Sequence, residues 1–128
     1  IEKEYELENN KYVINNTLNE DDALTKLTID SNEFNYEYDG LSRLVSSNIN
    51  GQNITNYKYK TNGKRTSNIV ESIKNNDDTY SYRYNELGNI IKIYHNDILE
   101  NEYYYDNYNE LIKEDNYILN RTIKYSYD

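Results

Sequence analysis

The sequence contains no cysteine, no proline, no methionine and no tryptophan, and it has only four glycines. Without cysteine the chain forms no disulfide bond and performs no thiol chemistry, as in cytosolic proteins or secreted proteins of the Gram-positive type. Since proline is absent, no residue is barred from donating to a β-sheet ladder. No apolar run approaches the ~18 residues of a membrane span, and no signal peptide is recognisable.

Acidic residues outnumber basic ones, and the net charge is −9. This charge disfavours nucleic acids and anionic membranes as partners. The hydrophobic fraction is only 36%, yet the chain contains 17 tyrosines, so any core is built largely from tyrosine. Buried tyrosine needs a hydrogen-bond partner for its hydroxyl, and we expect the abundant Asn, Thr and Ser side chains to supply it.

A Tyr-x-Tyr phrase recurs five times along the chain. The second tyrosines of successive copies are separated by 21, 25, 21 and 22 residues. Regular self-similarity at such a period is typical of a repeat architecture. The residues that carry the repeat are Tyr36, Tyr38 and Asp39; Tyr57, Tyr59 and Gly63; Tyr82, Tyr84 and Gly88; Tyr103, Tyr105 and Asp106; and Tyr125 and Tyr127.

Each copy predicts a strand whose two tyrosine rings share one face, because side chains alternate along a strand. We therefore expect the second tyrosine to be more buried than the residue before it, since a charged set cannot form the inner face. The four pairs to compare are Tyr38 with Glu37, Tyr59 with Lys58, Tyr84 with Arg83 and Tyr105 with Tyr104.

A turn should follow each copy, with a left-handed residue four positions beyond the second tyrosine. Gly and Asn tolerate the positive φ that this position requires. Ser42 suits it less well than its counterparts in the later copies, which are Gly63, Gly88 and Asn109. An apolar or β-branched strand comes next, and a second turn then returns the chain. Asn50-Gly51 is the strongest hairpin signal among these second turns.

One repeat is thus a β-hairpin, and the fold is predicted to be all-β, a curved antiparallel meander of β-hairpin repeats. Residues 1–128 are interpreted as a single repeat segment of a larger protein, with 1–21 irregular or a degenerate repeat and 22–128 as hairpin repeats. From residue 43 onward the expected strands are Arg43–Asn48, Asn53–Lys60, Lys64–Ile73, Thr79–Asn85, Asn89–His95, Ile98–Asp106, Glu110–Glu114 and Ile118–Tyr127.

The beginning of the chain is the least periodic part. Two strands are expected around Asn9-Asn10, followed by a polar, turn-like stretch from Asn15 to Asp22, with a helix within 15–27 as the alternative. The stretch from Asp22 to Leu27 matches the stretch from Asp39 to Leu44 position by position. We therefore align Asp22 with Asp39, which puts Asp21 where the tyrosine of the repeat should be.

These phrases resemble the tyrosine-aspartate (YD) repeats of the Rhs family over roughly residues 22–128. The family pattern is Tyr-x-Tyr-Asp, two residues, Gly, then Arg or Asn, then Leu or Ile. Residues 36–44 fit it apart from Ser42 in the Gly place, and residues 82–90 fit it apart from Asn85 in the Asp place. The stretch from Asp106 to the end looks especially like the wall-associated Rhs proteins of clostridia and bacilli.

The resemblance implies a large secreted or cell-surface bacterial protein, associated with the cell wall. Its repeats would form a β-sheet strip that spirals into a hollow shell, which in toxin-bearing members encloses a C-terminal toxic domain. The partners that the resemblance implies are the neighbouring repeats of the parent chain and a toxin cargo domain. A cell-wall or glycan ligand is the further partner expected if the tyrosine ladder is a platform on which sugars stack. No self-cleaving core segment is recognisable in this sequence.

A few side chains could in principle carry chemistry. His95 is the only histidine and is interpreted as a surface residue at the end of a strand. The acidic stretches Glu20-Asp21-Asp22 and Asp77-Asp78 match no calcium loop and are interpreted as solvated turns. Glu100 and Glu102 have the residue type of a glycosidase pair, but at i and i+2 on a strand they more simply form a polar face. We therefore expect no catalytic residue, no cofactor and no metal.

The sequence thus predicts a non-enzymatic structural segment of an Rhs-type shell. The alternative is a carbohydrate- or cell-wall-binding repeat module, in which the tyrosines would stack on sugars. Those modules usually carry tryptophan, which this chain lacks. We also expect weak homodimers that pair through the first and last strands, because unpaired strand edges are templates for strand addition.

Overall fold

The computed structural model describes residues 2–7, 10–62 and 64–127, and side chains from residue 13 onward. Every regular element among these residues is a β-strand. The all-β class and the antiparallel meander of hairpins are therefore confirmed, and the alternative of a helix within 15–27 is wrong. The chain divides into two units, Ile1–Tyr57 and Lys58–Asp128, and strand β6 (Gln52–Asn62) passes from the first to the second.

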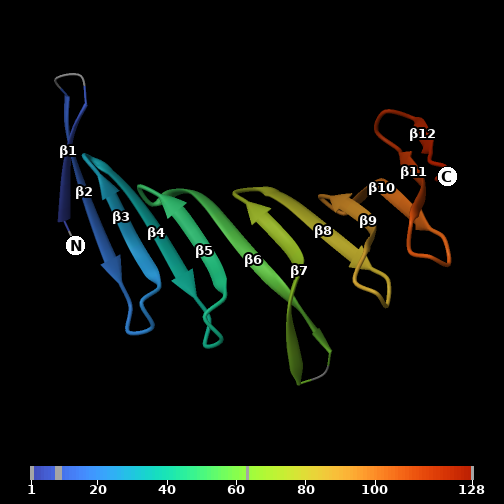
Figure 1. Ribbon diagram of the computed structural model, residues 1–128, viewed down its shortest axis with the longest axis horizontal. Coiled ribbons are helices and arrows are strands. Elements are labelled where there is room, and N and C mark those ends of the chain that lie inside the picture. Colours follow the sequence, from blue (N-terminus) through green and yellow to red (C-terminus); the bar gives the residue numbers. More distant parts are fainter. Residues whose placement is uncertain (1, 8–9, 63, 128) are drawn as a thin grey trace. The chain divides into compact units, whose positions relative to one another are not determined.

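The first unit is an antiparallel series in which each strand pairs with the one before it in sequence (Figure 1). The alternation of apolar and polar side chains along its strands is typical of a sheet with one apolar face. Before β6, its strands are β1 (Glu2–Leu7), β2 (Asn10–Leu18), β3 (Leu24–Ile29), β4 (Asn32–Tyr38) and β5 (Leu44–Ile49).

The second unit continues the same strand order without a crossover. Neighbouring strands are joined by short loops, as expected for a meander, because antiparallel strands need only a few linking residues. After β6, its strands are β7 (Arg65–Asn75), β8 (Asp78–Tyr84), β9 (Ile90–His95), β10 (Ile98–Tyr105), β11 (Leu111–Asn116) and β12 (Arg121–Lys124).

Tight turns join the second strand of one repeat to the first strand of the next. The β5–β6 loop consists of Asn50 and Gly51, with φ of 53° and 70°, and the β9–β10 loop of Asn96 and Asp97, with φ of 47° and 65°. Two successive positive φ values are those of a type I′ turn, whose twist matches that of the flanking strands. The hairpin predicted at Asn50-Gly51 is therefore confirmed.

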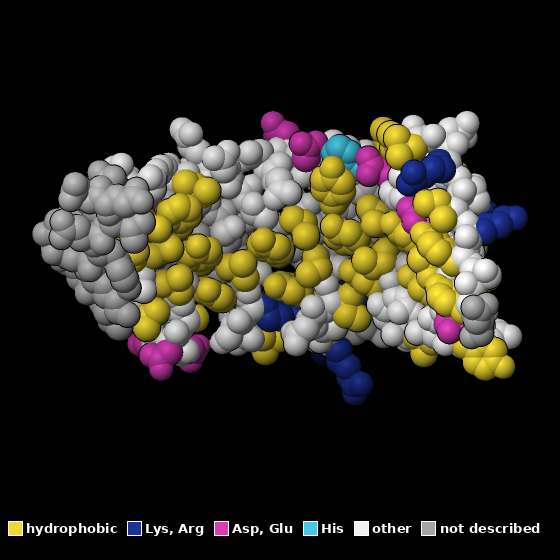
Figure 2. All heavy atoms as spheres, turned by 45° about the horizontal axis from the view of Figure 1, so that its top comes forward, with side chains coloured by type: hydrophobic (Ala, Val, Ile, Leu, Met, Phe, Trp, Pro, Cys, Tyr) yellow, Lys and Arg dark blue, Asp and Glu magenta, His cyan; other side chains and the backbone are white. Residues whose placement is uncertain are grey.

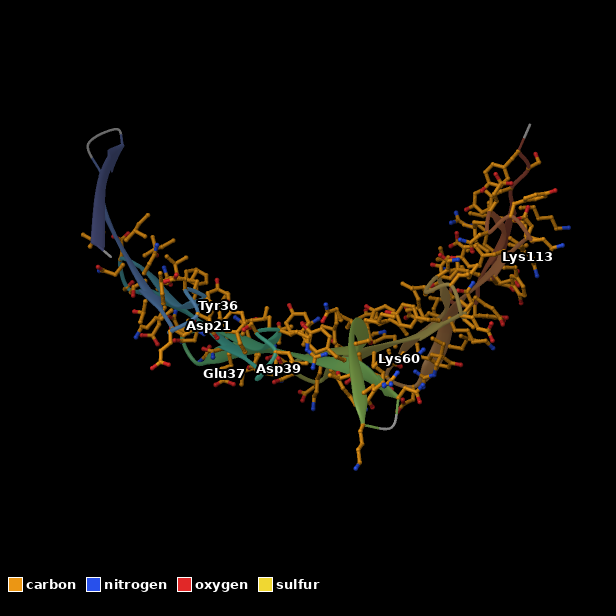
Figure 3. The ribbon with its side chains drawn as sticks, turned by 60° about the horizontal axis from the view of Figure 1, so that its bottom comes forward. Asp21, Tyr36, Glu37, Asp39, Lys60 and Lys113 are labelled. Carbon is orange, nitrogen blue, oxygen red and sulfur yellow. The ribbon has the colours of Figure 1, made fainter. Side chains whose placement is uncertain are left out.

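The strand register places apolar and polar side chains on opposite faces of each unit. In the first unit, Phe34 lies opposite both Leu27 and Ile49. In the second, Tyr82 lies opposite Ile93. Hydrophobic side chains gather on one face (Figure 2), and Tyr36 and Glu37 lie on opposite sides of the sheet (Figure 3).

No closed core lies beneath this apolar face. Among the residues whose side chains are described, none is buried. A sheet normally buries its apolar face against a second layer. Neither unit, taken by itself, contains one among its described residues.

The predicted order of burial holds for three of the four pairs. Tyr38, Tyr59 and Tyr84 are half-buried, whereas the residues before them, Glu37, Lys58 and Arg83, are exposed. In the fourth pair Tyr104 and Tyr105 are both half-buried. Tyr104 is partly covered on the polar face because the ammonium of Lys113 lies 4.5 Å from the centre of its ring.

Two predictions of strand extent are wrong. The strand expected over Ile118–Tyr127 is the much shorter β12, Arg121–Lys124, because residues 117–120 form the turn. The amide of Leu119 donates to Oδ1 of Asn116 there, at 2.7 Å. The polar stretch expected as a turn from Asn15 belongs instead to β2 as far as Leu18, since backbone pairing with β3 outweighs the weak strand propensity of Asn.

Candidate functional site

The most distinctive local structure is the turn that follows the second tyrosine of a repeat. At Asp39, Oδ1 accepts hydrogen bonds from the amides of Leu41, at 2.9 Å, and Arg43, at 3.1 Å. The backbone of Asp39 also donates to the carbonyl of Arg43 and accepts from the amide of Ser42, both at 2.9 Å. One carboxylate thus satisfies amides that the turn would otherwise leave without partners.

The same turn occurs four times with the same set of bonds. In every case Oδ1 of the first residue accepts from the amides two and four positions later, and the fourth residue has a positive φ. We call these the capped turns; they span residues 19–23, 39–43, 85–89 and 106–110. Their left-handed residues are Asp22, Ser42, Gly88 and Asn109. Ser42 therefore does adopt the expected conformation, with φ of 57°.

The first capped turn corrects the alignment of the degenerate repeat. Asn19, not Asp22, has the bonds of Asp39, and Asp22 is the counterpart of Ser42. Leu18 accordingly stands in the tyrosine position, where it pairs with Leu24 as Tyr38 pairs with Leu44. Asn replaces Asp without loss because both side chains present the same acceptor oxygen. The equivalence of Asn19 and Asp39 is hidden when only acidic residues are matched between the repeats.

In four copies of the repeat, the second tyrosine binds the preceding hairpin. The hydroxyl of Tyr38 donates to the carbonyl of Leu24 at 2.9 Å, and that of Tyr84 donates to the carbonyl of Val70 at 2.6 Å. Tyr105 and Tyr127 make the same bond with Ile90, at 2.9 Å, and Leu111, at 2.7 Å. The expectation that Asn, Thr and Ser would satisfy these hydroxyls is wrong for the four, since each uses a backbone carbonyl. We call these bonds the tyrosine clamps.

A third set of contacts links hairpins at the tight turns. The amide of Asn50 donates to the carbonyl of Glu33 at 2.7 Å, and its Oδ1 accepts from the amide of Glu33, also at 2.7 Å. Asn96 forms the same pair of bonds with Thr79, at 2.8 Å each, and Asp30 with Val13. A side-chain oxygen therefore prolongs the ladder one step beyond the end of the strands.

The other predicted repeat residues are less uniform. Tyr36, Tyr57, Tyr59, Tyr82 and Tyr103 are half-buried, and the hydroxyl of Tyr125 donates to Glu114 at 3.1 Å. Gly63 lies outside the described residues. After Tyr59, strand β6 runs on to Asn62, and strand β7 begins at Arg65. The copies that end at Tyr38, Tyr84 and Tyr105 have a capped turn at this place. The copy at Tyr59 has Lys60 in place of the Asp or Asn that would accept the turn amides.

His95 is more closely engaged than the surface residue that was predicted. Its ring stacks on Tyr80, with centroids 4.3 Å apart. Nε2 lies 2.9 Å from Asp78, and Nδ1 lies 3.1 Å from Glu100. The hydrogen bond with Asp78 raises the pKa of His95, partial burial opposes the rise, and Glu100 adds to it. The bond with His95 in turn lowers the pKa of Asp78.

The polar face of the second unit contains a network of ion pairs. Lys92 lies 3.1 Å from Glu102, whose other oxygen accepts from the hydroxyl of Tyr117 at 2.9 Å. The bond with Lys92 lowers the pKa of Glu102, and the bond with Glu102 raises the pKa of Tyr117. Glu102 thus binds Lys92 and Tyr117, whereas Glu100 binds His95, so the two carboxylates do not share one site.

The acidic side chains of the described residues do not gather into a metal site. Among the described residues, no group of three or more His, Asp or Glu side chains is arranged to hold a metal ion. The acidic turn residues Glu20, Asp21 and Asp22 are exposed. Within the same part of the chain, no helix is long and apolar enough to cross a membrane. What the geometry does provide is a repeated set of bonds that joins hairpin to hairpin.

Comparison with known proteins gives structural similarity alone. No family model matches the chain, and no curated protein matches it. Among solved structures, it is similar to a crystal structure of TcdB2-TccC3-Cdc42, with 21% identity over 82% of this chain and a TM-score of 0.43. It is also similar to a mutant Tc holotoxin pore of Photorhabdus luminescens, with 21% identity over 81% of this chain and a TM-score of 0.42. The match spans only 7% of each of those chains.

Proposed function

We propose that this chain is a structural repeat segment of a large secreted or cell-surface protein of the Rhs type, where it forms part of a β-shell. The observation that carries the proposal is the recurrence of the capped turn and the tyrosine clamp. Each clamp joins one hairpin to the hairpin before it, so the same contacts can be added indefinitely along a strip.

The half-buried tyrosine face supports this role. A face of Tyr, Ile, Leu and Phe that has no second layer gains stability when it is covered, because removing apolar area from water is favourable. In a shell, the cover would come from neighbouring repeats and from an enclosed cargo. A toxin domain downstream in the parent chain is the cargo that the YD resemblance implies.

We further propose that the segment has no enzymatic activity. Catalysis needs a nucleophile or base held in place by supporting groups. The carboxylates Asp78, Glu100 and Glu102 are held, but by His95, Lys92 and Tyr117 in ion pairs and hydrogen bonds on the sheet surface. Turnover of a glycan or peptide, abolished by replacing one of these residues, would contradict the proposal.

The decisive test is to sequence the reading frame around this segment and to image its complete product by cryo-electron microscopy. We expect further YD repeats on both sides and a hollow β-shell whose wall contains residues 22–127. A downstream domain protected from added protease until the shell is opened would identify the cargo. Flanking sequence without repeats, or a parent particle with no cavity, would refute the shell.

Carbohydrate binding is a second candidate function, and one feature favours it. The β6–β7 hairpin carries exposed basic and hydroxyl side chains in place of a capped turn. This surface differs from the tyrosine face on which stacking with sugars was expected.

A further inference from the structure

Charge is distributed unevenly along this acidic chain. Residues 40–70 contain no Asp or Glu, so all 23 acidic residues lie outside that stretch. The same stretch contains Arg43, Lys58, Lys60, Lys64 and Arg65. Four of these five cations fall in the β6–β7 hairpin. A protein with a net charge of −9 thus presents one strongly basic element.

The end of this hairpin is well placed to meet a partner. β6 and β7 each have 11 residues, whereas β8 has 7, and the residues of β7 that pair with β8 are Ser72 to Asn75. The hairpin end therefore extends beyond the ladder with β8 (Figure 1). Lys60, Lys64 and Arg65 are all exposed there. We call residues 58–62 and 64–69 the basic hairpin end.

Three of these five cations have no ion-pair partner in the part of the chain that the structure describes. Lys58 lies 2.8 Å from Glu71. Among the described residues, no carboxylate lies within ion-pair distance of Lys60, Lys64 or Arg65. Three adjacent cations without counter-charges repel one another, and an anionic ligand would relieve that repulsion.

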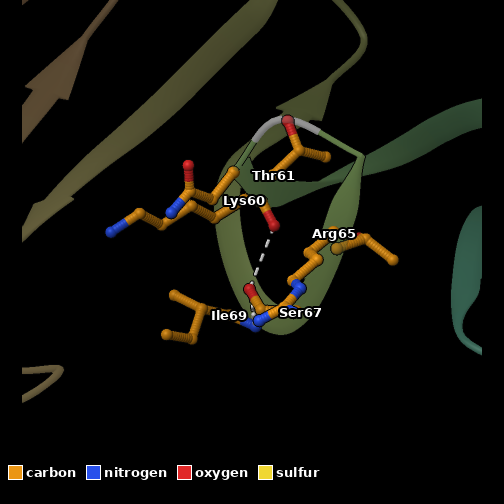
Figure 4. Close-up of a pocket in the computed structure, with 7 residues that line it drawn as sticks. Lys60, Thr61, Arg65, Ser67 and Ile69 are labelled. Atoms are coloured by element: carbon orange, nitrogen blue, oxygen red, sulfur yellow. Dashed lines mark hydrogen bonds between the residues drawn. The ribbon is translucent and has the colours of Figure 1, made fainter.

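A depression between β6 and β7 is lined by neutral polar side chains as well as by two of these cations. It has a volume of about 230 Å³, and both Lys60 of β6 and Arg65 of β7 line it (Figure 4). Its neutral lining includes Thr61, Asn62 and Thr66. Ser67 closes the hairpin by donating to the carbonyl of Lys60 at 3.0 Å.

We propose that the basic hairpin end binds an anionic polysaccharide, a sugar chain that carries sulfate or carboxylate groups. The cations would pair with the acidic groups, and the hydroxyl and amide side chains would bond with sugar hydroxyls. Single-stranded nucleic acid is less suited, since it usually stacks on aromatic rings, and none lines the depression. A protein partner is also less suited, because the lining contains no aromatic anchor and Ile69 is its one large apolar residue.

The test is isothermal titration calorimetry of the 128-residue chain at low and at physiological salt. The probes are heparin, which carries sulfate and carboxylate, polygalacturonate, which carries carboxylate alone, and dextran, which is neutral. The variant combines Lys60→Gln with Arg65→Gln. The matched control combines Arg121→Gln with Lys124→Gln, which removes the same two charge types from exposed positions on β12.

We expect heparin or polygalacturonate to bind, dextran not to bind, and affinity to fall as salt rises. Loss of two exposed charge contacts should weaken binding about tenfold in the hairpin variant, with less than about a twofold change in the control. Lys64→Gln, at the turn itself, provides a second variant that should weaken binding in the same direction. Comparing the two acidic probes tells whether sulfate or carboxylate is preferred.

Several results would overturn the inference. These are no binding of either acidic polysaccharide, equal weakening in the hairpin variant and the control, or tighter binding of oligo(dA) or poly-aspartate than of both polysaccharides. The last result would assign the hairpin to another class of macromolecule. The inference is independent of the shell proposal, because a shell wall could exist with or without a glycan-binding hairpin.

Discussion

At the scale of single residues, the repeat depends on which atoms a side chain presents rather than on its charge. Asn19, Asp39, Asn85 and Asp106 all cap their turns with Oδ1. At Asp39 the side chain does more, because Arg43 binds the second oxygen through Nε at 2.8 Å and lowers the pKa of the carboxyl group. The acceptor oxygen is common to all four turns, and the ion pair is local to one.

Replacing Asn85 tests the cap directly. Asn85→Ala leaves the amides of Leu87 and Asn89 without their acceptor, and we expect the free energy of unfolding to fall by about 1–2 kcal/mol. Asn85→Asp keeps the oxygen and restores the YD pattern, so it should remain within about 0.5 kcal/mol of the wild type. Urea unfolding followed by circular dichroism measures both. An equal fall in the free energy of unfolding in the two variants would mean that the acceptor oxygen does not stabilise the turn.

The tyrosine clamp is tested by removing one hydroxyl. Tyr84→Phe deletes the bond to the carbonyl of Val70 and should lower the free energy of unfolding by about 1 kcal/mol. Tyr82→Phe is the matched control, because this hydroxyl, on the same strand and face, has no bonding partner among the described residues. Chemical denaturation of both variants gives the comparison. A larger effect at Tyr82 would contradict the clamp.

The sequence predicted the period, the tyrosine face and the left-handed conformation of Ser42, Gly88 and Asn109, because these depend on local rules of alternation and φ. It could not reveal that the tyrosine hydroxyls bind carbonyls. A residue such as Leu24 or Ile90 gives no sign in its side chain that its backbone oxygen is an acceptor. It also missed the Asp78–His95–Glu100 contact, which depends on the registers of three strands at once.

At the scale of the element, β8, β9 and β10 are joined by this histidine. Asp78 and Tyr80 face it from β8, and Glu100 faces it from β10. A group whose pKa is raised on folding stabilises the folded state below its unfolded pKa, about 6.5 for histidine, and loses that contribution as pH rises through the folded pKa. These three strands should therefore be more stable at pH 6 than at pH 8.

Because His95 is the only histidine, its titration can be followed as a single imidazole signal by NMR. We expect a pKa above about 6.5 in the wild type. Asp78→Asn should lower it most, and Glu100→Gln should lower it less, since the bond with Asp78 is the larger cause. Asp97→Asn, which removes a nearby carboxylate of the β9–β10 turn, is the control. A wild-type pKa below 6.5, or a larger effect of Asp97, would contradict this account.

At the scale of the whole chain, the strand order ends in two edges, β1 and β12. The edge at β12 is shorter than the sequence predicted and carries two cations, Arg121 and Lys124, which weaken strand addition. The order itself followed from the repeat, because short turns between successive strands leave a meander as the simplest connection. The extent of the last strand did not, because Tyr117, Ile118 and Leu119 have the composition of a strand, yet residues 117–120 form a turn in which the Asn116 side chain accepts from the amide of Leu119.

We expect weak self-association through the β12 edge, and the structure indicates where to interrupt it. The amide of Tyr125 donates inward to the carbonyl of Ile112 at 3.0 Å. Since inward and outward amides alternate along an antiparallel edge, the amide of Lys124 points outward. Lys124→Pro should remove an edge donor while sparing the β11–β12 ladder, and it should reduce association. Lys124→Ala loses the same charge but keeps the donor, so it should associate at least as well as the wild type.

Sedimentation velocity over a concentration series, at low and moderate salt, measures this effect. The charge of −9 opposes association, and its repulsion is screened within about 10 Å at ordinary salt, so the dimer fraction should increase as salt is raised. Lys124→Pro should remain more monomeric than Lys124→Ala at every concentration, because only the proline removes the outward donor. A strict monomer at high concentration in both salts, or identical behaviour of the two variants, would show that the β12 edge does not pair. Association that fails in Lys124→Ala as well would assign the effect to charge instead of to the strand backbone.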